Sequence, residues 1–414
     1  MTAMPITSGG GGREVWVTGI GLLSSLGEGL EAHWAQLGGD TQLAPSPVIE
    51  AARFAPYPVH PMVPLDLSRQ IPRRSDQKQM EAWQHIGVYA AGLALDDAGI
   101  KGDAALSGNT HLVVAAGSGE RDTEVDERIL ELAKTCGEED LLANEILPSA
   151  LRPTLFLAQL SNLLAGNVSI VHNVTASSRT FMGEEMAGIA AIENAVRRVA
   201  SGQVAVVLAG GALNAERNDL LLNFELGSML WSRPYRATWE RSDEGGGFVP
   251  GSIGAFLVLE ARDHAEARGA RPHARITGVL SDRSDRTFGA AASSGSRLIT
   301  RLVRPGDLAG LAVLSGASGV EPVTGDELGL LTSDALGSMR PPIRAYGTAL
   351  GHGVEAHFPA GVALAALALS KGAFYPPFGA AGIECATLIK PDRILVTGFG
   401  HWRGEGVALL EEIV

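Results

Sequence analysis

The chain has 414 residues, 45% of them apolar, which is enough for a large core in two or three domains or in one duplicated unit. Its net charge of −13 argues against a nucleic-acid or membrane-surface partner. The only cysteines, Cys136 and Cys385, indicate a reducing cytoplasm rather than a disulfide framework. No unbroken apolar run reaches membrane-spanning length, so no membrane span is expected.

In chain order, residues 1–13 are expected to form a disordered tail, and short β-branched runs then alternate with long alanine-rich segments. This alternation is typical of an α/β fold. Several of the expected strands are apolar at every position, as in strands that helices cover on both faces. The expected strands are Val15–Thr18, Leu112–Ala116, Ser169–Asn173, Val204–Leu208, Phe256–Glu260, Ala312–Leu314, Ile343–Tyr346, Ile394–Thr397 and Val407–Glu411.

Two parts of the chain repeat one order of elements: strand, small-residue turn, long helix, and a strand that ends in glycines. In the first copy the helix is expected at about 177–200, and in the second at about 355–369. The returning strands end at Gly210-Gly211 and at Gly398 to Gly400. Two such halves packed back to back bring the helix N-termini together, where unpaired N–H groups suit a nucleophile or an oxyanion.

Landmarks along the whole chain carry a family resemblance. They are the opening run Val15–Gly27, the segment Leu95–Ile100, the run Arg233–Ala270, the motif Ala349–Gly353 and the triplet Gly398–Gly400. Together they resemble the β-ketoacyl-acyl-carrier-protein synthases, or ketosynthases. The resemblance implies an α/β, thiolase-like fold of two duplicated αβαβα halves in five layers, expected at 14–265 and 266–414.

The resemblance also implies a chemistry. Ketosynthases carry out decarboxylative Claisen condensation: a cysteine takes an acyl chain from acyl carrier protein, and two histidines help malonyl-carrier protein lose carbon dioxide. A thiolate at a helix N-terminus suits this role. Members are usually dimers, paired through the strand before the nucleophile. The resemblance implies no cofactor and no metal.

Several catalytic positions of the resembled family are occupied by other residue types. Placed after the expected strand Ser169–Asn173, the nucleophile position falls on Thr175. A threonine hydroxyl is a far weaker nucleophile than a thiol, and it is well suited to cap the start of a helix. Aligned on Gly325-Asp326, the first histidine position falls on Ser318. The lysine position, five residues before the second histidine, falls on Gly347.

The second histidine is present as His352, read either as a residual thioester or oxyanion contact or as a histidine held by packing at a helix start. Phe399 resembles the family's gating phenylalanine, and His401 and Trp402 put bulk where its pocket is open. His352 and His357 are five residues apart, so they do not have the usual helical spacing of a zinc pair.

Three hypotheses follow for a ketosynthase homologue without its cysteine. The first is a non-catalytic partner that resembles a chain-length factor, pairs with an active ketosynthase and shapes its acyl tunnel. The second is a remodelled acyltransferase or condensing enzyme that uses His352 or His401. The third is a homodimeric protein that binds acyl carrier protein or an acyl thioester. All three are expected in the cytoplasm, in fatty acid or polyketide biosynthesis.

Overall fold

The computed structural model of the chain describes residues 12–135, 139–150, 157, 159–304, 308–333, 336, 340–380, 382–386 and 389–413. Its strands are β1 Val15–Ser24, β2 Gly27–Glu28, β3 His111–Ala116, β4 Ser178–Met182, β5 Val206–Leu213, β6 Ile253–Ala261, β7 Ala274–Asp282, β8 Leu311–Ser315, β9 Ile343–Ala345, β10 Arg393–Phe399 and β11 Glu405–Glu411. Its α-helices are α1 Gly29–Gln36, α2 Arg74–Gln79, α3 Ala82–Asp97, α4 Ala104–Asn109, α5 Thr123–Thr135, α6 Glu139–Leu141, α7 Leu147–Ala150, α9 Leu163–His172, α10 Glu185–Ala200, α11 Asn218–Glu225, α12 Arg262–Ala267, α13 Ala290–Leu302, α14 Val323–Thr332, α15 Gly347–Leu350 and α16 His357–Lys371.

The strand order repeats itself about the middle of the sheet. It runs β4-β3-β5-β6-β1 and continues β7-β11-β10-β8-β9, with β2 paired to β1. In each half the outer strands pair in parallel (β4 with β3 and β3 with β5; β9 with β8 and β8 with β10) and the inner ones pair antiparallel. The two halves therefore have one topology, which confirms the expected duplication.

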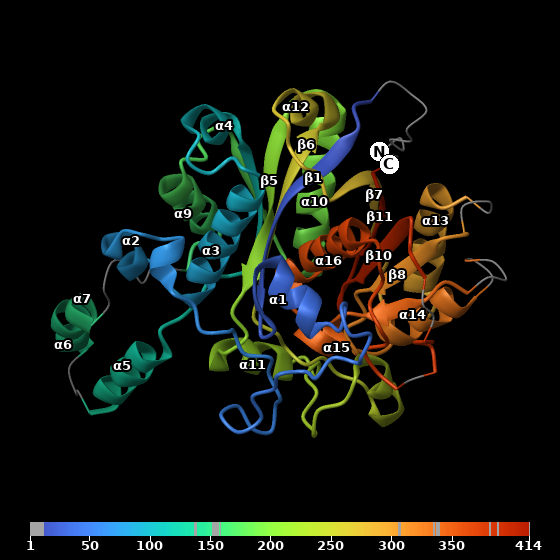
Figure 1. Cartoon of the computed structure of the whole chain (residues 1–414). Coiled ribbons are helices and arrows are strands. Elements are labelled where there is room, and N and C mark those ends of the chain that lie inside the picture. The colour runs from blue at the N-terminus through green and yellow to red at the C-terminus, as the bar shows by residue number, and fades with distance from the viewer. Residues whose placement is uncertain are drawn as a thin grey trace.

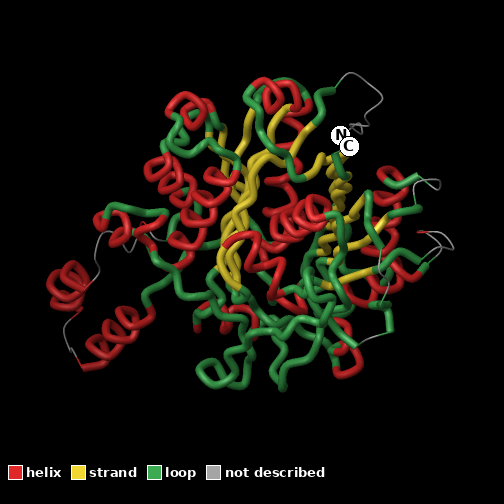
Figure 2. Tube along the Cα trace, viewed as in Figure 1, coloured by secondary structure: helices red, strands yellow, loops and turns green. Residues whose placement is uncertain are grey.

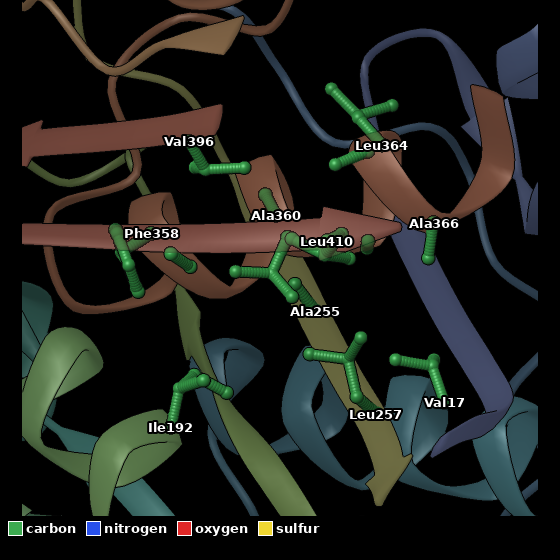
Figure 3. Close-up of a cluster of buried hydrophobic side chains, with 14 of the residues drawn as sticks. Val17, Ile192, Ala255, Leu257, Phe358, Ala360, Leu364, Ala366, Val396 and Leu410 are labelled. Carbon is green, nitrogen blue, oxygen red and sulfur yellow. The ribbon is translucent and has the colours of Figure 1, made fainter. Parts of the chain in front are cut away.

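The helices α10 and α16 form the central layer between the two halves (Figures 1 and 2). Both helices contribute many side chains to the largest core cluster, together with strands of both halves. Figure 3 shows this cluster, to which α16 contributes Phe358 and Leu364, β10 contributes Val396 and β6 contributes Leu257. A second core joins α3 and α9 to the outer face of the first half, and a third joins α13 and α14 to the second. The five expected layers are thus present.

The expected strand Ser169–Asn173 is wrong: these residues end helix α9, and Asn173 closes it in the left-handed conformation at φ 56°. A short apolar run does not distinguish a buried helix from a strand, and the β-branched Ile170 and Val171 favour the strand prediction. The real strand is β4, whose sequence Ser-Arg-Thr-Phe-Met is polar and partly exposed because it lies at an edge of the sheet. Strand β7 was not expected either.

The opposite edge of the sheet is covered. Strand β9 is buried along its length, and its Ala345 N–H donates to Glu384 Oε1 at 2.8 Å. The other carboxylate oxygen of Glu384 accepts the N–H of Phe378 at 2.6 Å. The loop that carries Glu384 therefore provides β9 with a hydrogen-bond partner where a further strand would pair.

The boundary expected between residues 265 and 266 stays a prediction, and the expected tail lies almost wholly outside the described residues. Helices α5, α6 and α7 extend away from the body at the lower left of Figure 1. Within the described part of the chain, none of the helices combines the length and the hydropathy needed to span a bilayer.

Candidate functional site

The candidate site lies where the two central helices begin. Strand β4 ends at Met182, and Gly183 turns the chain at φ 134°, a conformation that favours glycine, so that α10 begins at Glu185. One turn further on, a Cβ on Gly188 would lie 2.4 Å from the carbonyl oxygen of Glu355. This close approach of the two backbones brings the start of α10 against the segment that leads into α16.

Four buried ionisable side chains meet at this point. Glu185 Oε1 lies 3.2 Å from His352 Nε2 and 3.2 Å from His401 Nδ1. The ring of His357 lies against that of His352, with centroids 4.0 Å apart. None of the four residues is more than 6% exposed. They come from α10, from the loop before α16, from α16 itself and from the loop after β10, so the fold brings together three distant parts of the sequence.

The hydrogen bonds of these side chains are incomplete. His352 Nε2 is paired with Glu185, but His352 Nδ1, His357 Nε2 and both ring nitrogens of His401 have no hydrogen-bond partner among the described residues. His401 Nδ1 is close enough to Glu185, but its direction is wrong for a hydrogen bond. The packing of Phe248 against the rings of His352 and His401 holds both in place.

Burial keeps the whole cluster close to electrical neutrality. Desolvation raises the pKa of Glu185 to about 7, because the carboxylate is buried and the backbone N–H groups near it compensate only in part. Desolvation also lowers the pKa of His357 and His401 to about 3, and that of His352 well below its usual value. A second carboxyl, Glu355, has its pKa raised to about 8 by burial and by the proximity of Glu185.

A cavity of about 380 Å³ opens beside the cluster. Glu184, Glu355 and Trp402 are among its lining residues, and each of these three is close in sequence to a member of the buried cluster. Trp402 stacks on Phe224 at a centroid distance of 5.7 Å, and both rings face the cavity. A small or elongated ligand in this cavity would lie next to Glu355, with Glu185 and the histidines behind it.

The structure places Thr175 away from this site. It lies in the exposed loop between α9 and β4, where its hydroxyl donates to the carbonyl of Gly108 at 3.4 Å. Thr175 neither begins nor caps α10. The prediction that it does so depended on the expected strand Ser169–Asn173, which is helical. The residue that follows the strand and opens the long helix, ahead of the small residues Ala187 and Gly188, is Glu185.

Ser318 and Gly347 are both buried, Ser318 in the loop after β8 and Gly347 at the start of α15. The Ser318 hydroxyl accepts the backbone N–H of Val320 at 3.1 Å, which stabilises the turn after β8. Gly347 opens α15, and a Cβ there would lie 3.5 Å from His357 Cε1. The expected lysine position therefore borders the histidine cluster, although through His357 rather than His352.

The three expected pocket residues face different surroundings. Trp402 lines the cavity, and His401 is buried behind it as part of the cluster. Phe399 belongs to the core between β10, α13 and α14, and its ring occupies the space next to Gly295. Successive residues of a strand point to opposite faces, and Gly398, which faces Phe358 of the central layer, leaves Phe399 on the outer one.

Sequence reasoning missed Glu185, Glu355 and His357 as members of the site. A signal for Glu185 was present, because the motif Gly183-Glu184-Glu185 precedes small residues that open a helix of 16 residues ending at Ala200. The contact of His357 with His352 had no comparable signal, since five residues along a regular helix do not bring two rings together. The 3-10 turn Val354–Ala356 between them makes that contact.

Comparison with known proteins identifies the family and agrees with the fold. The family model of the β-ketoacyl synthase N-terminal domain matches residues 12–265. A 3-oxoacyl-[acyl-carrier-protein] synthase 2 of Vibrio cholerae is 26% identical over 272 residues, which are 64% of this chain and 62% of that protein. The match thus spans less than two thirds of that relative.

Two solved structures show the same fold over almost the whole chain. The ishigamide ketosynthase/chain length factor superposes with a TM-score of 0.77 at 22% identity, covering 97% of this chain and 100% of the other. A type II polyketide synthase acyl-carrier protein in complex with its ketosynthase gives a TM-score of 0.75 at 17% identity, with the same coverage. Since the family model matches more than half of the chain and the thiolase-like fold extends through the rest, the chain belongs to the β-ketoacyl synthase family.

Proposed function

We propose that this chain is a non-condensing member of its family, a partner that resembles a chain-length factor and binds an acyl chain or its carrier protein beside an active ketosynthase. The observation that carries the proposal is the side chain at the start of α10. In the resembled enzymes a cysteine opens this helix after the strand, whereas here Glu185 does so. Cys385, the cysteine within the described residues, lies in an exposed loop.

The carboxyl of Glu185 does not substitute for the thiol. An acyl group on a carboxylate is a mixed anhydride, which lies well above the thioester from which the acyl group would have to come. With its pKa raised to about 7 by burial, Glu185 is also largely protonated below neutral pH, which lowers its nucleophilicity further. Ser318, whose hydroxyl is engaged by the Val320 N–H, is a weaker donor to an enolate than an imidazole.

The edge strand β4 supports a paired assembly. One side of β4 pairs with β3, and its other edge has no strand partner among the described residues. Ile170 of α9, which packs beside β4, and Met182 at its end are 65% and 70% exposed. Large exposed apolar side chains beside a free edge favour association. The dimer interface proposed here is therefore β4 rather than residues 169–173.

The lining of the cavity beside Glu355 supports the proposal that the chain binds an acyl group or its carrier. Its wall combines the aromatic rings of Trp83, Phe224 and Trp402 with carboxyl groups, a mixture suited to an acyl thioester or the thiol-bearing arm of a carrier protein. A solved structure of the same fold is a complex with an acyl-carrier protein. The proposed role therefore needs binding at this cavity and no transfer chemistry.

The test combines mass spectrometry with co-purification. Incubation of the pure chain with acyl-carrier protein and malonyl-carrier protein should give neither an acyl adduct nor a condensed product. Glu185→Cys should acquire an acyl group slowly and condense little, because groups that act as a unit are strongly non-additive. Co-expression with a ketosynthase encoded beside it should yield a heterodimer with altered product length. Separate homodimers with unchanged products would contradict the partner role.

The second candidate is a remodelled acyltransferase that uses His352 or His401. The observation that favours it is the contact of both rings with Glu185, a carboxyl whose pKa of about 7 suits proton transfer at neutral pH. Turnover of an acyl thioester by the chain alone, lost in His352→Gln and in His401→Gln but kept in Thr175→Ala, would establish this function in place of the first.

A further inference from the structure

The buried cluster has the ligand set and spacing of a metal centre. One carboxylate oxygen and two imidazole nitrogens, from Glu185, His352 and His401, lie within 4.8 Å of one another. Zinc binds such atoms at about 2.0–2.2 Å, which places tetrahedral ligand atoms about 3.3 Å apart. Two of the three separations here are 3.2 Å, and the third, between the two imidazoles, is within 4.8 Å.

The directions of these atoms argue for a common ligand rather than for contacts among themselves. One carboxyl proton or one ring N–H makes a single hydrogen bond between Glu185 and His352. His401 Nδ1 lies at the same distance from that oxygen without the geometry of a hydrogen bond. A buried polar atom without a partner costs about 1–3 kcal/mol, and no placement of protons satisfies both rings. A cation between the three residues would bind one nitrogen lone pair from each imidazole and one oxygen of the carboxylate.

The surrounding charges are compatible with a divalent ion. Two neutral imidazoles and one carboxylate leave one positive charge, and the Glu355 carboxyl lies close enough to interact with Glu185. Arg286 also faces the cluster, but its guanidinium donates to Glu405 and to the carbonyls of Gly400 and Gly404. The positive charge of Arg286 is thereby offset by the fully buried carboxylate of Glu405.

Access to the site is available through the cavity. Glu184, Val354, Glu355 and Trp402 line it, and each is one to three residues from a ligand candidate. An ion held by three protein ligands keeps a fourth position free for water or for a ligand atom, as zinc sites of the catalytic type do. A cavity beside such a position is the arrangement in which a thioester carbonyl or a carboxylate could reach the ion.

We infer that Glu185, His352 and His401 form a binding site for one divalent transition-metal ion, of which zinc is the best match to two nitrogens and one oxygen in tetrahedral array. The inference does not rest on the proposed function, since a metal site and a missing thiol are independent properties of the same pocket. The sequence did not indicate it, because the three ligands are far apart in the chain.

The experiment uses the full-length, tag-free chain. After metal stripping and dialysis against Zn²⁺, elemental analysis should give one zinc per chain, and Co²⁺ should give the intense visible absorption of a four-coordinate site. Glu185→Gln and His401→Gln should each weaken Zn²⁺ binding by about a hundredfold or more, since loss of even an outer partner costs about 10–100-fold. His33→Gln is the matched control, because His33 is equally buried but has both ring nitrogens hydrogen-bonded elsewhere.

Circular dichroism and thermal melting establish whether each variant is folded. If a ligand variant fails to fold, the Co²⁺ spectrum of the unaltered chain and its displacement by Zn²⁺ still decide the matter. Less than stoichiometric zinc, an octahedral Co²⁺ spectrum, or equal affinity in the folded Glu185→Gln and His33→Gln variants would overturn the inference. Failure of the partner experiment above would leave this result unchanged, so the two proposals are distinguishable.

Discussion

Gly188→Ala tests the packing that brings the two central helices together at the site. A Cβ at this position would lie 2.4 Å from the carbonyl oxygen of Glu355 and 2.9 Å from Pro359 Cδ. The first contact is with backbone, so relief requires α10 to move away from the 3-10 turn Val354–Ala356 and the start of α16. Glu185 lies one turn before Gly188, and His352 lies just before that turn.

Two opposing effects set the magnitude. Replacement of glycine by alanine inside a helix gains about 1 kcal/mol of helix propensity. Overpacking of a well-filled interior costs about 1–3 kcal/mol, and a clash of this severity belongs at the upper end. We therefore expect Gly188→Ala to lower the free energy of unfolding by about 2 kcal/mol. Gly329 is the matched control, because it lies in helix α14 with nothing within 4 Å of a Cβ. Gly329→Ala should raise stability by about 1 kcal/mol.

Urea unfolding followed by tryptophan fluorescence measures both variants against the unaltered chain. The expected result is opposite signs for the two substitutions. Equal stabilisation by both would refute the reasoning, because it would show that α10 and the segment before α16 are not in close backbone contact at Gly188.

Three further predictions concern other parts of the molecule. Ile170→Asp combined with Met182→Asp should convert the expected dimer to a monomer in light scattering, whereas Phe288→Asp, at an 87% exposed site of the other half, should leave it paired. Phe224→Ala should cost about 3–5 kcal/mol of unfolding free energy, because the ring is buried against Phe248 and Trp402, and Leu226→Ala, at a 79% exposed side chain, less than about 0.5. Burial lowers the pKa of His33 from 6.5 to about 4, so its neutral form stabilises the fold above pH 6.5 and this contribution is lost as the pH falls towards 4. Relative to pH 7.5, the unaltered chain should therefore lose about 2 kcal/mol more at pH 5 than His33→Gln does in urea unfolding, and parallel pH profiles would contradict this assignment.

The sequence predicted the parts of the fold that have strong patterns. Strands such as Phe256–Glu260 and Ile394–Thr397 are apolar because both faces are covered, and they were found near their true limits. Strand β4 was missed because an exposed edge strand carries no such pattern, while the apolar end of α9 imitated it. Because of that single exchange the sequence places the expected nucleophile position at Thr175, whereas the residue that opens α10 after β4 is Glu185. His401 and His352 were identified as candidates, but their contact with Glu185 depends on tertiary structure.

The two ends of the sheet differ in a way that limits how copies of the chain can assemble. The Ala345 N–H already donates to the Glu384 carboxylate and is not available to a neighbouring strand. Addition of a strand at β9 is therefore blocked. Among the described strands β4 has the one edge left open for pairing, and when two copies pair through it both of these edges are occupied. Such an isologous contact gives a closed dimer, whereas unpaired strands at both ends of the sheet would permit open-ended filaments. Loss of the Glu384 side chain should therefore lower solubility as well as stability, because it also leaves the buried N–H groups of Ala345 and Phe378 without this acceptor.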